Sequence, residues 1–133
     1  MGLVKVEIEL SNPRKTSKGS VSRSALTDTG ALHLCIPKEL AEELDLEELH
    51  SRRVTTADGS SHECPYVGPI KIQVANRECF TGAIMLGNEV LLGAVPVEDM
   101  DLWISPSGHQ VVPNPASPDT PLSVAKGIRT RLR

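Results

Sequence analysis

Aromatic residues are scarce in this sequence: one Trp, one Tyr and one Phe make up 2% of its 133 residues. We therefore expect a core of aliphatic side chains, mainly Val, Ile and Leu. No apolar run approaches the roughly 20 residues of a membrane-spanning helix, and the N-terminus lacks the apolar region of a signal peptide. Three cysteines, an odd number without disulfide-framework spacing, indicate a reducing compartment, and we expect the cytoplasm.

An excess of positive charge is also missing. The net charge of −3 and the pI near 5.8 argue against a general nucleic-acid or membrane-surface binder. Positive charge collects only at the C-terminus, where residues 122–133 hold four basic and no acidic side chains. This end could contact an acidic partner or nucleic acid, but a frayed, solvated terminus is the simpler interpretation.

The length and the order of apolar and turn residues predict one all-β domain, residues 1–113, followed by a Pro-containing basic tail, residues 114–133. Residues 4–10 alternate apolar and charged side chains, which is typical of a half-buried strand. One or two short helices are expected, at residues 37–44 and 96–100, and residues 39–48 suggest an acidic helix face. The other expected strands are residues 21–27, 33–36, 53–57, 61–67, 69–74, 79–86, 90–92, 102–104 and 110–112.

The tripeptide Asp28-Thr29-Gly30 ends an apolar strand-like run and is followed by Ala31. It places a carboxylate in a tight turn directly after a buried strand, which glycine permits. A second element, Val90-Leu91-Leu92-Gly93, follows about 60 residues later. Neither motif is specific alone, but the pair at this spacing is informative.

Together these motifs resemble the retropepsin-like aspartic proteases (clan AA), and in particular their small bacterial single-domain members. The resemblance extends from about residue 3 to about residue 113 and includes the Asp58-Gly59 turn and the segment 96–102. It implies a closed β-barrel-type domain of the retropepsin and pepsin kind. It also implies an aspartic endopeptidase that uses no metal and no cofactor.

Hydrolysis at a carboxyl pair needs one carboxylate as the base that takes a proton from water and one carboxylic acid as the proton donor. Two aspartates held close together cannot both ionise, so they share one proton. This chain has a single Asp-Thr-Gly. The resemblance therefore predicts a symmetric homodimer in which Asp28 of each subunit meets the other across the two-fold axis.

The resemblance also assigns the site residues. The expected catalytic loop is Asp28, Thr29 and Gly30, with the Thr29 hydroxyl bonding across the dimer. We expect the Asp58-Gly59 hairpin to be the flap that closes over an extended peptide. The expected substrate-binding residues are Ala31, Leu32, His33, Ala57, Asp58, Gly59, Leu91 and Leu92.

Several positions depart from the family pattern. Thr27 stands where an apolar residue is usual, so its hydroxyl would need a partner near the core. Leu32 and His33 replace two acidic residues of the retroviral members, and Ala94 replaces a frequent arginine. Because the ion pairs of that dimer interface are missing, we expect residues 102–112 to contribute to dimerisation.

Two other functions stay open. The fold could persist as a non-catalytic dimer that binds a peptide or a protein partner. The pairs His33-x-Cys35 and His62-x-Cys64 would each place both side chains on one strand face, a possible zinc site. Their spacing lacks a Cys-x-x-Cys knuckle, so buried thiols are the simpler interpretation, and nothing marks a Cys–His nucleophile.

Overall fold

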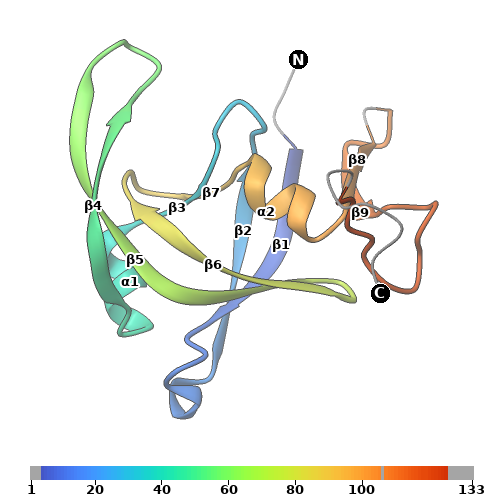
Figure 1. Cartoon of the computed structure of the whole chain (residues 1–133), viewed down its shortest axis with the longest axis horizontal. Helices are drawn as coiled ribbons and strands as arrows, with labels where there is room; N and C mark the ends of the chain where they lie inside the picture. Colours follow the sequence, from blue (N-terminus) through green and yellow to red (C-terminus); the bar gives the residue numbers. More distant parts are fainter. Residues whose placement is uncertain (1–3, 106, 126–133) are drawn as a thin grey trace, which may run out of the picture.

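Six strands of this computed structural model form a closed barrel, shown with the rest of the chain in Figure 1. The structure describes residues 4–105 and 107–125. The barrel strands are β1 (Val4–Ser11), β2 (Ser20–Thr27), β7 (Val90–Leu92), β3 (Leu34–Ile36), β6 (Arg77–Met85) and β5 (Ser61–Val74), in spatial order. β5 pairs again with β1, which closes the barrel. The predicted all-β closed barrel is confirmed.

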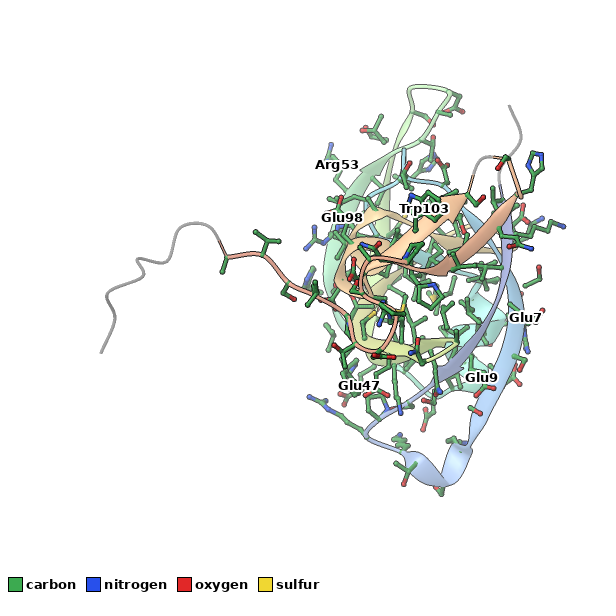
Figure 2. The ribbon with its side chains drawn as sticks, turned by 90° about the vertical axis from the view of Figure 1, so that its right-hand side faces the viewer. Glu7, Glu9, Glu47, Arg53, Glu98 and Trp103 are labelled. Carbon is green, nitrogen blue, oxygen red and sulfur yellow. The ribbon has the colours of Figure 1, made fainter. Side chains whose placement is uncertain are left out.

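The remaining elements lie outside the barrel wall. β4 (Glu47–Thr55) pairs with β5 and extends it as a hairpin, and β8 (Leu102–Ser105) and β9 (Gln110–Pro113) form a separate two-stranded sheet. Figure 2 shows the side of the molecule where Trp103 of β8 lies. The helices are α1 (Lys38–Glu43) and α2 (Ala94–Asp99), with a short 3-10 turn, η1, at Thr16–Lys18. No helix in the described residues is long and apolar enough to cross a membrane.

The barrel core is aliphatic, as the composition predicts. Alternation in β1 buries Ile8 and Leu10 and leaves Glu7 and Glu9 exposed. The three aromatic side chains lie outside the core cluster. Phe80 and Trp103 are exposed, and Tyr66 is half-buried.

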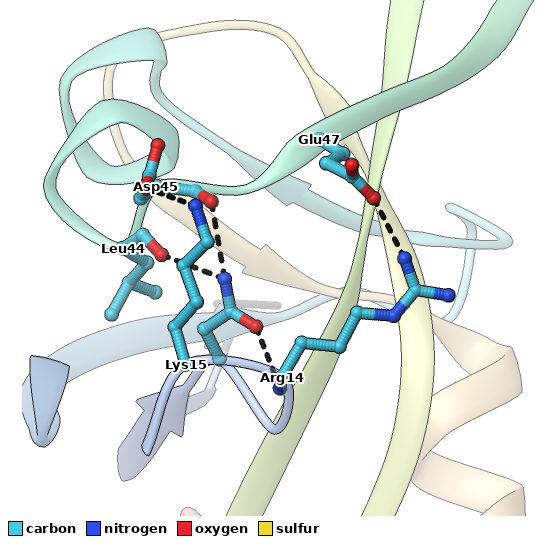
Figure 3. A network of polar contacts seen from close by, with 6 residues as sticks. Arg14, Lys15, Leu44, Asp45 and Glu47 are labelled. Carbon is cyan, nitrogen blue, oxygen red and sulfur yellow. Dashed lines mark hydrogen bonds and ion pairs between the residues drawn. The ribbon is translucent and has the colours of Figure 1, made fainter. Parts of the chain in front are cut away.

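A polar network fixes the loop after β1 against the connection from α1 to β4 (Figure 3). The buried Asn12 amide donates to the carbonyl oxygens of Leu44 (3.0 Å) and Asp45 (3.1 Å), and its side-chain oxygen accepts from the Arg14 backbone N–H. Arg14 pairs with Glu47 at 2.7 Å, and Lys15 pairs with Asp45. The amide bonds hold the end of α1 in place, because a buried amide without partners would be costly.

Two of the differences from the boundaries predicted by the sequence have a clear local cause. The short helix predicted at residues 37–44 is confirmed as α1, Lys38–Glu43. The acidic helix face predicted to reach residue 48 is wrong, because Asp45 adopts a positive φ of 54° and Glu47 and Glu48 already belong to β4. The strands predicted as 61–67 and 69–74 are one strand, β5. Its register shifts between Val67 and Ile70, where Pro69 has no N–H for the ladder.

Candidate active site

Asp28 occupies a tight turn at the end of β2. Its backbone N–H donates to the Leu92 carbonyl (3.0 Å), and its carbonyl accepts from the Ala31 N–H (3.0 Å). Its carboxylate oxygen Oδ1 accepts from the Gly30 N–H at 2.9 Å. A Cβ on Gly30 would lie 3.1 Å from the same oxygen, so glycine keeps this side of the carboxylate open. Asp28 is half-buried, whereas Thr29 and Gly30 are exposed.

β7 supports this turn from behind. It lies between β2 and β3, with Leu91 opposite Leu26 on one side and opposite Cys35 on the other. At Gly93 a Cβ would stand 2.4 Å from the His33 carbonyl oxygen, a distance that real side chains do not tolerate. The Leu-Leu-Gly motif therefore packs directly against the segment that follows Asp28.

The start of α2 continues this contact. The Ala94 N–H donates to the Ala31 carbonyl (2.8 Å) and the Val95 N–H to the Leu32 carbonyl (2.9 Å). These two bonds hold residues 31 and 32 beside Asp28. The Leu32 side chain points outward and is 58% exposed.

The two leucines predicted to line the site have different environments. Leu91 is half-buried, whereas Leu92 is fully buried in the barrel core. Leu92 therefore packs inside the barrel below the turn. Only Leu91 of the two has exposed surface that could contact a ligand.

The β4–β5 hairpin carries the predicted flap residues at its exposed tip. The loop before β3 and this hairpin lie toward the same end of the molecule in Figure 1. Asp58 Oδ1 accepts from the Thr56 hydroxyl (2.7 Å), the Ser60 hydroxyl (2.6 Å) and the Ser60 N–H (3.0 Å). These bonds hold the pKa of Asp58 well below its usual range. Gly59 follows with φ of +86°, which favours glycine.

The structure brings the residues from Asp28 to His33 together with Leu91. Within the described part of the chain, however, no hydrogen bond joins that loop to Ala57, Asp58 or Gly59. The hairpin meets the loop nearer its base. Arg52 Nη1 lies 3.2 Å from His33 Nε2, and the Arg52 guanidinium lies over the Tyr66 ring.

Arg52, Tyr66 and His50 were not among the predicted site residues. Arg52 and His50 are exposed residues of β4, a strand whose largely polar sequence gives no buried face to detect. One feature of the sequence could have indicated them: His50 and Arg52 are two residues apart, so on a strand their side chains share a face.

The Cys35 thiol of β3 is not suited to act as a nucleophile. Burial raises the pKa of the Cys35 thiol, and the nearby Cys64 and Asp28 raise it further. A raised pKa is the opposite of what a nucleophilic thiol needs.

No group of three or more His, Cys, Asp or Glu side chains in residues 4–105 and 107–125 could hold a metal ion. His62 instead contacts the Ser60 hydroxyl at 2.9 Å. The buried Thr27 hydroxyl finds no hydrogen-bond partner within the described part of this single chain, contrary to the expectation from sequence.

The comparisons with known proteins agree with the motif at Asp28. A model of the aspartyl protease family matches residues 15–68, from the loop after β1 into β5, and so includes both the Asp28 turn and the hairpin tip. The resemblance to aspartic proteases predicted from the sequence motifs is thereby confirmed over this segment. No curated protein matches the sequence significantly.

Among solved structures, the solution structure of the simian foamy virus (mac) protease is similar. It shares 21% sequence identity, with 70% of this chain and 90% of that chain covered, and a TM-score of 0.47.

Proposed function

We propose that this protein is a homodimeric aspartic endopeptidase that hydrolyses peptide bonds with Asp28 of each subunit. The observation that carries the proposal is the Asp28 turn itself. Its carboxylate accepts from the Gly30 N–H, and it lies within residues 15–68, which match the aspartyl protease family. β7, which is outside the matched segment, pairs with β2 directly before the turn.

The second carboxylate has to come from a second copy of the chain. The sequence has one Asp-Thr-Gly, and the Asp58 carboxylate is occupied by its own turn. In a symmetric dimer the two Asp28 side chains would face each other and share one proton. The ionised Asp28 would take a proton from water as the oxygen attacks the peptide carbonyl, and the protonated one would donate to the carbonyl oxygen.

The neighbouring residues receive roles from their positions and from the family resemblance. Thr29 would bond across the dimer axis, and Gly30 would let the scissile peptide approach. Ala31, Leu32, His33 and Leu91 would contact the substrate, with Leu92 as core support. The tip at Ala57, Asp58 and Gly59 would close over the peptide and exclude water.

Partners and location follow from the same proposal. The partners would be a second copy of the chain and a peptide or protein substrate, with no nucleic acid and no membrane. The three cysteines are free thiols, which suits the reducing cytoplasm. The basic residues predicted to form the tail's charged end, from Lys126 on, lie outside the described residues.

The test is cleavage of a peptide library by the purified dimer between about pH 4 and 7, with Asp28→Asn as the matched variant. We expect cleavage by the wild type and a loss of at least about 1,000-fold in Asp28→Asn, with the dimer intact by sedimentation. If a verified dimer cleaves nothing, the alternative of a non-catalytic peptide- or partner-binding dimer replaces the enzyme.

A further inference from the structure

Four side chains gather where the hairpin meets the loop that follows Asp28. The His50 ring stacks on the Tyr66 ring with centroids 4.8 Å apart, and the Arg52 guanidinium lies 4.9 Å from the Tyr66 centroid. The His33 ring meets the Tyr66 edge at 5.9 Å, and its Nε2 lies 3.2 Å from Arg52 Nη1. Tyr66 thus forms a platform with three nitrogen-bearing side chains around it.

The Tyr66 ring is itself fixed in place. It lies against Gly82 of the neighbouring strand β6, where an added Cβ would come within 2.3 Å of the ring. The absence of a side chain at Gly82 lets the ring lie flat on the sheet. A platform held in this way orients the groups that pack on it.

The strand register places His50, Arg52, Cys64 and Tyr66 on one face of the hairpin. His50 is opposite Tyr66, and Arg52 is opposite Cys64. Side chains two residues apart on a strand share a face. The face that carries Arg52 and Tyr66 is therefore the face that contacts His33, which follows Asp28 in the same loop.

Arg52 has hydrogen-bonding capacity to spare. It forms no ion pair with any carboxylate in the part of the chain that the structure describes. The next residue, Arg53, is on the opposite face and pairs with Glu63 at 4.0 Å. A guanidinium has five N–H donors, of which Arg52 gives one to His33. The planar fork that remains suits a carboxylate.

His33 and Tyr66 position the Arg52 guanidinium without neutralising its positive charge. Burial and the Arg52 charge lower the pKa of His33, so the neutral ring can accept from Arg52. The face of the Tyr66 ring attracts the guanidinium, and the N–H groups at the edge of the guanidinium stay available to a ligand. Nothing in this cluster supplies negative charge to compete with an incoming ligand.

We propose that Arg52, positioned by His33 and Tyr66, binds the carboxylate of a Glu or Asp side chain in the peptide substrate. This inference rests on the proposed function, because it places the acidic side chain on the peptide that lies between the hairpin and Asp28. The substrate class is therefore a peptide with an acidic residue on one side of the cleaved bond.

The test compares peptide libraries that differ only in having Glu or Gln at each position in turn. We expect the wild type to cleave the Glu peptide about tenfold faster, as kcat/KM, at one position, since a charge-assisted bond is gained there. Arg52→Gln should abolish this preference. Arg53→Gln, the neighbouring arginine on the other face, is the matched control and should keep it.

Charge reversal separates recognition from a structural role of Arg52. Arg52→Glu should favour Lys over Glu at the same position. An equal loss on Glu and Gln peptides in Arg52→Gln, or no charge preference in the wild type, would overturn the inference.

A binding assay keeps the inference distinct from the enzyme proposal. Fluorescence anisotropy with Asp28→Asn should show tighter binding of the Glu peptide than of the Gln peptide, and Arg52→Gln in that background should remove the difference. If binding shows this pattern but the wild type cleaves nothing, the endopeptidase fails and the acidic subsite stands. If neither peptide binds and none is cleaved, the inference fails as well.

Discussion

Gly93 is the residue at which the backbone behind Asp28 leaves no space for a side chain. Its Cβ position is 2.4 Å from the His33 carbonyl oxygen and 2.8 Å from the His33 nitrogen. Both are backbone atoms, so neither can rotate away. The glycine of the Leu-Leu-Gly motif thus sets how closely β7 and the loop after Asp28 approach each other.

Substitution of Gly93 should therefore be costly. We expect Gly93→Ala to lower the free energy of unfolding by about 3 kcal/mol, because the chain has to shift to relieve the overlap. Denaturant unfolding followed by circular dichroism measures this change. Gly108→Ala is the control, since its Cβ would meet the Ser105 hydroxyl at 3.2 Å and the Gln110 side chain at 3.8 Å. Both are side chains and can rotate away, so this variant should change stability by less than about 0.5 kcal/mol. Equal effects at the two sites would contradict the packing argument.

At the level of single residues, the sequence predicts some contacts well and others poorly. The Asp28 turn and the Gly93 approach follow from short motifs in which glycine has a steric role. The cluster around Arg52 joins β4, β5 and the loop before β3, so its members are far apart along the chain. Such a contact depends on strand register, which sequence patterns alone do not specify when a strand is exposed on both faces.

At the level of elements, the segment after β9 is bonded to the barrel. Asn76 donates to the Pro118 carbonyl (3.0 Å), and the buried Arg77 donates to the Ser117 carbonyl. The Asp101 carboxylate accepts from the Ser117 hydroxyl (2.5 Å) and from the Leu122 N–H (3.0 Å). Residue 113 is the predicted end of the domain. Residues 117 and 122, which follow it, are nevertheless held in place by hydrogen bonds to Asp101.

This attachment should depend on pH. Hydrogen bonds from Ser117, Leu122 and Asn114 lower the pKa of Asp101 from 3.8 to about 2, and the Arg77 charge adds to this. A lowered pKa means that the ionised form stabilises the fold. The contribution is complete above about pH 4 and is lost as the pH falls toward 2.

Asp101→Asn measures that contribution. We expect the variant to have a lower Tm than the wild type at pH 6, and the difference to shrink as the pH is lowered from about 4 to about 2. Thermal unfolding at a series of pH values gives the result. A difference that stays constant over this range would show that Asp101 acts through packing and not through its charge.

The sequence predicts the bounds of a strand best where apolar and polar residues form a clear pattern. β1, β2 and β7 have buried faces and begin and end within a residue of their expected bounds. β4 begins six residues before the predicted position 53, at Glu47. Its polar first half gains strand structure by pairing with the long β5, which is a tertiary effect that local sequence does not encode.

At the level of the whole molecule, the proposed dyad requires a second subunit, and we propose that an exposed aromatic residue contributes to the surface that would bind it. Trp103 of β8 is 49% exposed (Figure 2). β8 follows α2, whose first residue is bonded to the loop beside Asp28. We therefore expect the sheet of β8 and β9 to contribute to the proposed dimer contact.

Trp103→Ala should weaken the dimer about tenfold or more, because aromatic side chains dominate interface energetics. Sedimentation equilibrium measures the dimer Kd. Phe80→Ala is the matched control: Phe80 is 57% exposed on β6 and lines a hollow with the loop that contains η1. That loop precedes the start of β2, whereas Asp28 follows the other end of this strand. An unchanged Kd for Trp103→Ala would place the interface elsewhere.

The central claim is that one catalytic unit uses Asp28 from two subunits. The most direct measurement mixes wild-type subunits with an equal amount of Asp28→Asn, allows them to exchange, and records peptide cleavage. If both carboxylates are required, roughly a quarter of the dimers stay active and cleavage falls to about a quarter of the all-wild-type value at the same total concentration. A fall to only about half, in proportion to the wild-type subunits, would mean that each subunit acts alone and would contradict the shared site.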